Sequence, residues 1–320
     1  MKSKAAKHGV QLRTHLKTAK SLDVANRIVD QSNPGITVST LREAEYFAAG
    51  GYKDILYAVS LEPRKFERVG ALYQNGIGLK VILDDIFVAR QLCDWTETTG
   101  CIVDCLIEID TDGERAGIVP DSDELITLAQ TLENGSHVKF SGVMTHAGGS
   151  YNCHSFDQIK AHAEQERAGC VLAAQRIRDA GIDCGVVSIG STPTIVASEN
   201  FAGVTEIRPG VYVFYDLFQA GLGVCQLQNI ALSVMATVIG HSRTKGRIFL
   251  DAGALALSKD RSTGSQQQDY GYGLLCDLNG KPLQQNLFVS GVNQEHGIVN
   301  VEDSSVFDEL PIGTMVRVLP

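Results

Sequence analysis

The stretch Leu12-Arg13-Thr14-His15-Leu16-Lys17-Thr18-Ala19-Lys20 closes a short run of alternating residues near the start of the chain. The alternation, which runs from Val10 to Leu16, predicts a β-strand with one buried face. Lys17 would then lie at the carboxyl end of a barrel strand, where barrel enzymes keep their catalytic groups. A lysine buried there has a lowered pKa and can attack a carbonyl carbon as a neutral amine. Taken alone, Lys17 is better explained as a solvated surface residue, because most lysines in basic stretches are solvated.

Strand-like and helix-like segments alternate over the first two thirds of the chain. Helical patterns fill the gaps between the strands, as in Leu41–Ala49 and in residues 155–180. Because strands that alternate with helices form parallel sheets, this pattern predicts an α/β fold, a (β/α)8 TIM barrel. A doubly wound open sheet is the main alternative. The predicted strands are residues 10–17, 36–40, 54–60, 78–84, 102–110, 138–146, 186–190 and 204–208.

The pattern changes after Leu222. Strand-like segments continue there with little helix between them, joined by turns rich in glycine and polar residues. We therefore expect a barrel domain over residues 1–222 and an all-β domain over residues 223–320. Residues 261–270 form its most polar predicted loop, either mobile or a flap over the active site. The predicted strands of this domain are residues 231–241, 247–251, 271–277, 287–299 and 314–319.

Composition excludes several classes of protein. The chain has 320 residues, 44% hydrophobic and 20% charged, and a formal net charge of −9. The negative charge argues against nucleic-acid binding, and no apolar run approaches the roughly 20 residues that span a bilayer. The eight cysteines are scattered, without a paired CxxC motif. We therefore expect a cytoplasmic protein with reduced thiols that acts on a small molecule.

Two segments near the end of the barrel domain have the composition of a phosphate site. Residues 188–194 (SIGSTPT) follow the seventh predicted strand, and residues 205–212 (TEIRPGVY) surround the eighth. Glycine lets the backbone approach an anion closely, and barrels frequently bind phosphate at the loops after strands seven and eight. Two ordinary turns are the alternative. His146 ends the sixth predicted strand. It could lie beside the ring of a cofactor, or it could be a hydrogen-bonded histidine of the core.

Eight segments together resemble a known family. The chain is similar to the fold-type III pyridoxal-phosphate enzymes of the D-threonine aldolase and D-serine dehydratase family, which are related to alanine racemase. The family motif usually reads Arg-Pro-His-x-Lys-Thr-His-Lys, and here Thr14 and Ala19 replace its proline and second histidine. The matching segments, in the family's order, are LRTHLKTAKS, VSTLREAEYFAAGG, EIDTDGERAGI, MTHAGGSY, SIGSTPT, EIRPGVYVFYDLFQ, DAGALALSKD and VNQEHGIV.

The resemblance implies roles for particular residues. Lys17 would bind pyridoxal 5′-phosphate covalently and, with His146, act in catalysis. His15, the first histidine of the motif, would contact the cofactor. The family would also work as a homodimer. Arg115, His146 and Tyr151 would flank the cofactor ring, and the phosphate would be held by Gly190, Ser191, Thr192, Gly210 and Tyr212.

The resemblance also implies a divalent metal, zinc or manganese. In this family a His-x-Cys or His-x-Asp pair binds it, just after the strand that matches residues 315–320. The sequence stops at Pro320 before such a pair and opens almost on the first barrel strand. We therefore expect a fragment of a longer enzyme, with no metal ligand among the residues present.

The implied activity is that of a lyase. The family acts on β-hydroxy D-amino acids, either removing water from D-serine- or D-threonine-type substrates or splitting them by aldol cleavage. A racemase is an alternative, with Tyr270 or Tyr272 as the second base. A non-catalytic protein that binds pyridoxal phosphate is a further one.

Overall fold

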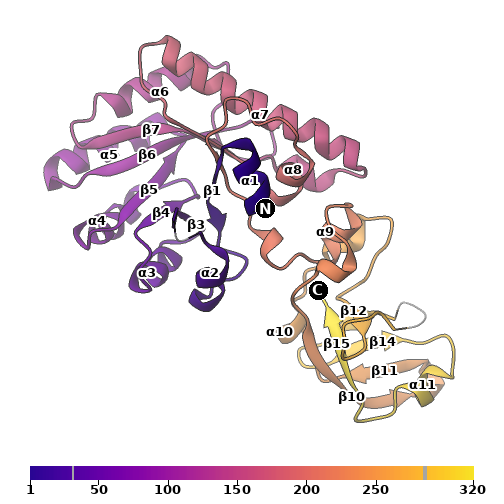
Figure 1. Ribbon diagram of the computed structural model, residues 1–320. Helices are drawn as coiled ribbons and strands as arrows, with labels where there is room; N and C mark the ends of the chain where they lie inside the picture. The colour runs from indigo at the N-terminus through magenta and orange to yellow at the C-terminus, as the bar shows by residue number, and fades with distance from the viewer. Residues whose placement is uncertain (31, 284–286) are drawn as a thin grey trace. The chain divides into compact units, whose positions relative to one another are not determined.

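A computed structural model describes residues 1–30, 32–283 and 287–320. The described chain divides into two compact units, Met1–Val213 and Phe214–Pro320. The first is coloured indigo to pink and the second orange to yellow in Figure 1.

The first unit is built on a nine-stranded sheet whose strands are all parallel. The order of strands begins with β1 and ends with β2, and these two are separated only by Arg13. The two edge strands of the sheet, β1 and β2, are therefore consecutive parts of one extended segment. The sheet closes on itself through this segment and forms a nearly closed barrel, as predicted. The strands are β1 (Gln11–Leu12), β2 (Thr14–His15), β3 (Ile36–Val38), β4 (Asp54–Tyr57), β5 (Gly78–Leu83), β6 (Val103–Ile109), β7 (Val138–Thr145), β8 (Val186–Ile189) and β9 (Glu206–Ile207).

The strand that opens the barrel differs from the prediction in its burial. We expected one buried face, but both faces are covered: Leu16 is 0% exposed on one side and Arg13 is 5% exposed on the other. The reason is that a barrel strand faces helices outside and side chains inside. The amide of Arg13 donates to the carbonyl of Ile207 on β9, and further along the strand the amide of Leu16 donates to the carbonyl of Thr37 on β3.

Helices lie on the outside of the strands (Figure 1). The predicted helix Leu41–Ala49 is found with those bounds, and the amide of Glu43 donates to the capping hydroxyl of Thr40 at 3.0 Å. Ser155 caps the longest helix in the same way. No described helix is long and apolar enough to cross a membrane. The helices are α1 (Lys2–His8), α2 (Leu22–Ile28), α3 (Leu41–Ala49), α4 (Phe66–Gln74), α5 (Ile86–Thr99), α6 (Asp123–Glu133), α7 (Phe156–Asp179) and α8 (Thr192–Ala197).

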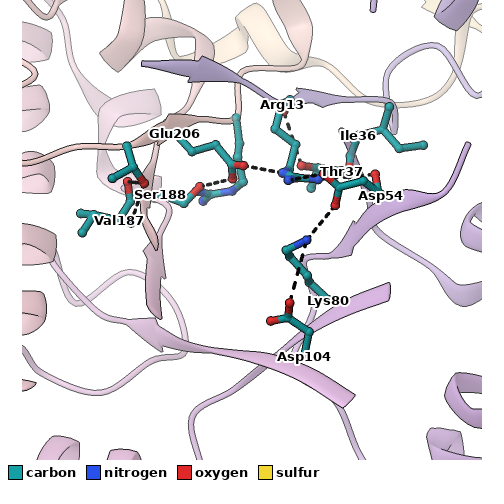
Figure 2. Close-up of polar contacts among 11 residues, drawn as sticks. Arg13, Ile36, Thr37, Asp54, Lys80, Asp104, Val187, Ser188 and Glu206 are labelled. Carbon is teal, nitrogen blue, oxygen red and sulfur yellow. Dashed lines mark hydrogen bonds and ion pairs between the residues drawn. The ribbon is translucent and has the colours of Figure 1, made fainter. Parts of the chain in front are cut away.

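The barrel interior is arranged in layers, because every second residue of each strand points inward. One layer, near the amino ends of the strands, is ionic. In Figure 2, Arg13 lies between Glu206 and Asp54, and Lys80 lies between Asp54 and Asp104. The next layer is apolar and consists of Leu56, Ile82, Leu106 and Met144. The third layer lies at the carboxyl ends of the strands and holds the candidate site.

The second unit contains a six-stranded antiparallel sheet in the order β12-β15-β10-β11-β14-β13. The single strand predicted over residues 287–299 is wrong, because the described part of this segment forms a hairpin. A backbone bond of 2.8 Å from the amide of Asn293 to the carbonyl of His296 closes its turn. The strands are β10 (Val234–Ser242), β11 (Arg247–Leu250), β12 (Leu274–Cys276), β13 (Val289–Val292), β14 (Gly297–Asn300) and β15 (Met315–Leu319), and the short helices are α9 (Leu217–Gly221), α10 (Ala254–Leu257) and α11 (Val306–Glu309).

Candidate active site

A cavity lies among the carboxyl ends of the barrel strands and the loops that follow them. It brings together five of the residues predicted from the sequence: His15, Lys17, Arg115, His146 and Gly190. The full lining is His15, Lys17, Ser39, Ala58, Val59, Glu108, Arg115, Met144, His146, Gly190 and Arg208.

Lys17 lies in the turn that follows β2, two residues beyond the strand. We expected a buried lysine at this position. In the barrel unit, taken by itself, the side chain of Lys17 is instead exposed at the cavity. Nζ makes no hydrogen bond or ion pair with another described residue. Partial desolvation, with the nearby charges of Arg115 and Arg208, lowers the pKa of Lys17. The lowered pKa makes the neutral, nucleophilic form of the amine easier to reach than in a solvated lysine.

His146 follows β7 and presents an unsatisfied ring nitrogen. Its Nδ1 lies 3.2 Å from the carbonyl oxygen of Gly190. Because a carbonyl can only accept, Nδ1 carries the proton and Nε2 is left as an acceptor. Nε2 is buried and has no partner in the described chain. Burial, and then the charge of Arg115, lower the pKa of His146 to about 3, so the ring is neutral at pH 7.

His15 supports the turn that carries Lys17. The amide of Lys17 approaches Nδ1 of His15 at 3.4 Å, and Nε2 of His15 lies 3.4 Å from the hydroxyl of Ser39. The amide can only donate, so Nδ1 accepts and Nε2 carries the proton. Burial lowers the pKa of His15 well below its usual value, and the charges of Lys17 and Arg208 add to the effect. His15 is therefore a neutral residue that holds the Lys17 turn.

Two charged residues of the cavity were not predicted. Arg208 follows β9 and is 4% exposed; it donates to the hydroxyl of Ser188 at 2.6 Å and to the carbonyl of Thr145 at 2.5 Å. Glu108 on β6 accepts a bond of 3.0 Å from the hydroxyl of Ser60, and burial raises its pKa. Alternation could have found both: Arg208 and Glu108 each lie two positions beyond an inward-facing residue, Glu206 and Leu106 respectively.

Most of the predicted phosphate residues lie behind the cavity wall. Among them only Gly190 lines the cavity, with a φ of +121° that favours glycine. The hydroxyl of Thr192 accepts a bond of 3.1 Å from the amide of Tyr212 and so joins the loops after β8 and β9. Ser191 caps α8 and contacts the hydroxyl of Ser150 at 3.2 Å. These residues form one connected wall.

Gly210, Tyr212 and Tyr151 also adjoin lining residues. A Cβ on Gly210 would lie 2.9 Å from the carbonyl oxygen of His15, so the loop after β9 passes directly against the first strand. The hydroxyl of Tyr212 lies 2.7 Å from that of Thr14. The Tyr151 ring packs near His146, with 6.1 Å between the ring centroids. The predicted set is thus gathered at one end of the barrel, in contact with the cavity or with its lining.

Comparisons with known proteins agree with this geometry. The family model described as alanine racemase, N-terminal domain, matches residues 1–217, and the model described as putative serine dehydratase domain matches residues 231–320. The chain is 45% identical over 325 residues to D-threo-3-hydroxyaspartate dehydratase of Delftia sp. (strain HT23), covering 100% of this chain and 85% of the relative. It is 30% identical to D-serine dehydratase of Dictyostelium discoideum, with 100% and 85% covered.

A solved structure extends the comparison. A cysteine-to-alanine variant of D-threo-3-hydroxyaspartate dehydratase, in the metal-free form, superimposes with a TM-score of 0.96 at 44% identity, covering 100% of this chain and 85% of the variant. The chain belongs to the alanine racemase N-terminal domain family, in the group that carries the serine dehydratase domain. The predicted family, the barrel fold and the class of lyase are confirmed.

The family implies pyridoxal phosphate, and the residues present fit that group. The cofactor has an aldehyde, an aromatic ring with polar substituents and a phosphate. The cavity offers an unpaired amine at Lys17, a buried orphan acceptor at Nε2 of His146, and the two arginines Arg115 and Arg208. A divalent metal finds no such fit, because the described residues include no group of three or more histidine, cysteine, aspartate or glutamate side chains that could hold one.

Proposed function

We propose that this lyase uses pyridoxal phosphate bound at Lys17 to remove water from a β-hydroxy D-amino acid, with D-threo-3-hydroxyaspartate as the favoured substrate. The observation that carries the proposal is the pairing of an unpartnered Lys17 amine with the unsatisfied Nε2 of His146 in one cavity. The identity to a relative of that name over the whole chain supports the choice of substrate.

The cavity residues divide the work between holding and proton transfer. When bound, pyridoxal phosphate supplies an electron sink for the bonds to the α-carbon of an amino acid. Lys17 would hold the cofactor covalently, and its amine would accept the α-proton of the substrate, a role that its lowered pKa supports by easing loss of the amine's own proton. Nε2 of His146 would accept a hydrogen bond from the cofactor or from the substrate. Loss of the β-hydroxyl as water, followed by hydrolysis, converts each substrate into one 2-oxo acid and one ammonium ion.

The charge of the cavity supports an anionic substrate. Arg115 and Arg208 supply positive charge in addition to Lys17, which would hold the cofactor, and Glu108 is the single carboxylate in the lining. The guanidinium of Arg115 is exposed and forms no hydrogen bond or ion pair with another described residue, so it is free to bind a carboxylate. A substrate with two carboxylates matches this excess of positive charge better than serine, which has one carboxylate. The described residues offer no ligand set for the divalent metal, zinc or manganese, that the resemblance implies.

The first test is a cofactor titration. We expect purified protein to develop a visible absorbance band with pyridoxal phosphate, and borohydride to fix the cofactor on the peptide that contains Lys17. Lys17→Ala should lose both signals. Lys20→Ala is the matched control, because Lys20 lies on the same turn but pairs with Glu43 at 3.1 Å. A fixed adduct on another lysine would contradict the site.

The second test identifies the reaction. The loaded enzyme is incubated with D-threo-3-hydroxyaspartate, D-serine and D-threonine, and the products are separated. A 2-oxo acid with equimolar ammonium supports dehydration, and the proposed preference requires the highest kcat/KM for the dicarboxylic substrate. Glycine with an aldehyde would show aldol cleavage instead, and the inverted amino acid alone would show a racemase.

We also infer a cytoplasmic homodimer. All eight cysteines are free, which supports a reducing compartment. On the six-stranded sheet, Met235, Ile239 and Met315 are exposed on the face opposite the buried Ala236 and Val238, which supports an apolar contact between copies. Sedimentation velocity of the loaded enzyme measures the state, and a monomer at micromolar concentration would contradict the dimer.

A further inference from the structure

We propose that Glu166 is a positioning residue that sets the spacing between the loops after β7 and β8, and thereby shapes the site for the phosphate of the cofactor. The proposal rests on the function proposed above, because it assigns a role toward the same cofactor. Glu166 does not line the cavity and touches no reacting atom. It acts through the backbone of two loops.

The setting of Glu166 is unusual for a carboxylate. It lies within the 24-residue helix α7 and is 0% exposed, on a face whose other buried members are small or apolar, such as Ile159, Ala163 and Cys170. Burial raises the pKa of Glu166, which shows that its ionised form is disfavoured there. Its Oε2 is buried without a partner in the described chain. Helix packing gains nothing from such a group, since an apolar side chain of similar size would avoid the desolvation cost.

The contacts of Glu166 explain its presence. Oε1 accepts a bond of 2.9 Å from the amide of Ala147 and a bond of 3.2 Å from the amide of Gly190. Ala147 directly follows His146, and Gly190 directly precedes Ser191 and Thr192. One oxygen therefore holds two loops at a common point, and each loop carries part of the proposed site.

Other bonds cross the same gap, but they run between the loops alone. Nδ1 of His146 meets the carbonyl of Gly190 at 3.2 Å, and the hydroxyl of Ser150 meets that of Ser191 at 3.2 Å. Glu166 adds a fixed point on the helix layer, so that both loops are placed relative to α7. Without it, the loops can move together away from the barrel while they keep their mutual bonds.

The experiment compares two ligands that differ only in the phosphate. The dissociation constants of pyridoxal 5′-phosphate and pyridoxal are measured from the visible band of the apo-enzyme. The constant for pyridoxal divided by that for pyridoxal 5′-phosphate is the ratio that reports the phosphate site, and it falls when the phosphate is bound less well. We expect Glu166→Leu to weaken pyridoxal phosphate binding by about 10- to 100-fold, the range for buried hydrogen-bond donors left unpaired, and pyridoxal binding by about threefold or less. Glu166→Gln keeps one acceptor oxygen and should hold the ratio within about threefold of the wild type.

The control separates positioning from packing. Cys170→Ala removes a buried side chain one turn later on the same face of α7, and it should lower the melting temperature while leaving the ratio unchanged. If Glu166→Leu also lowers only the melting temperature, Glu166 is a structural residue and the proposal is wrong. If the ratio falls in Cys170→Ala as much as in Glu166→Leu, the proposed role of Glu166 is also wrong.

A second variant covers a failure of Glu166→Leu to fold. Ala147→Pro removes one of the two amide donors, and Ala147 has a φ of −72° that proline can adopt. It should lower the same ratio, and an unchanged ratio would contradict the role of Glu166. Absence of any preference for the phosphorylated ligand in the wild type would instead refute the cofactor site itself, a result distinct from failure of the Glu166 role.

Discussion

At the scale of single residues, His146 shows how burial prepares a group for a ligand. Nδ1 is occupied by the carbonyl of Gly190, so the ring has one tautomer and one free acceptor, Nε2. A charged imidazolium could not keep that acceptor. The lowered pKa of His146, about 3, therefore preserves the hydrogen-bonding capacity that the proposed site needs.

The same burial has a cost at acid pH. The pKa of His146 is about 3 in the folded chain against an ordinary 6.5, so the unfolded chain binds a proton first as the pH falls. Stability from this group is complete above pH 6.5 and is lost as the pH falls toward 3. Between pH 7 and pH 4.5, we expect the wild type to lose about 2 kcal/mol more unfolding free energy than His146→Gln.

Urea unfolding at the two pH values measures this difference. His154→Gln is the matched control. His154 lies eight positions later in the segment before α7, and it is exposed. Equal losses in the wild type and in His146→Gln would show that the ring takes up its proton in the folded state as readily as in the unfolded state.

Residues of the site differ in how far the sequence could predict them. Lys17, His146 and Gly190 follow strands, and strand ends can be located from the sequence pattern. Arg208 and Glu108 are missed when motifs are considered without the alternation of inward-facing positions. Glu166 could not be predicted, because residues 160–167 of its helix are almost all polar or small, and only packing shows which of them faces inward.

At the scale of elements, Arg13 stabilises the point where the barrel closes. Its Nε lies 2.5 Å from Glu206 and its Nη2 lies 2.8 Å from Asp54, so its guanidinium joins strands on both sides of the first strand (Figure 2). Burial disfavours its charge, but Glu206 and Asp54 outweigh this effect and hold the pKa of Arg13 above its ordinary value. The first strand is divided into β1 and β2 at this residue, and the ionic layer continues across it.

Removal of one partner should therefore be costly. Arg13→Met leaves the buried carboxylate of Glu206 without its counter-charge, and we expect a loss of about 3–5 kcal/mol in unfolding free energy. Arg13→Met combined with Glu206→Leu removes both charges and should recover most of that loss. Arg68→Met, which breaks an exposed pair with Glu45 at 2.7 Å, should cost about 1 kcal/mol or less. Urea denaturation decides, and equal losses for Arg13→Met and Arg68→Met would refute the argument.

The elements themselves could largely be predicted. Each barrel strand lies where alternation and β-branched residues place it, since a parallel strand must be apolar over several consecutive positions. The ends are shorter than predicted, as at Ile36–Val38 within residues 36–40. The hairpin between β13 and β14 was missed because its turn, residues 293–296, has neither glycine nor proline to mark it.

At the scale of the whole molecule, the two units have separate cores. One cluster of buried apolar residues belongs to the barrel unit and includes Leu128 and Ile177, whereas another belongs to the sheet unit and includes Val289 and Val299. Each unit thus has the means to fold as a cooperative body. The residues proposed to bind the cofactor all belong to the barrel unit.

This separation predicts two thermal transitions that respond to different changes. Leu128→Ala should lower the transition of the barrel unit and Val299→Ala that of the sheet unit, because each creates a cavity in one core. Pyridoxal phosphate at about 100 times its dissociation constant should stabilise only the barrel transition, by about 2.7 kcal/mol, since its proposed contacts lie there. Scanning calorimetry of the full chain, with and without cofactor, measures both. A single transition shifted by both substitutions and by the cofactor would show instead that the two units unfold together.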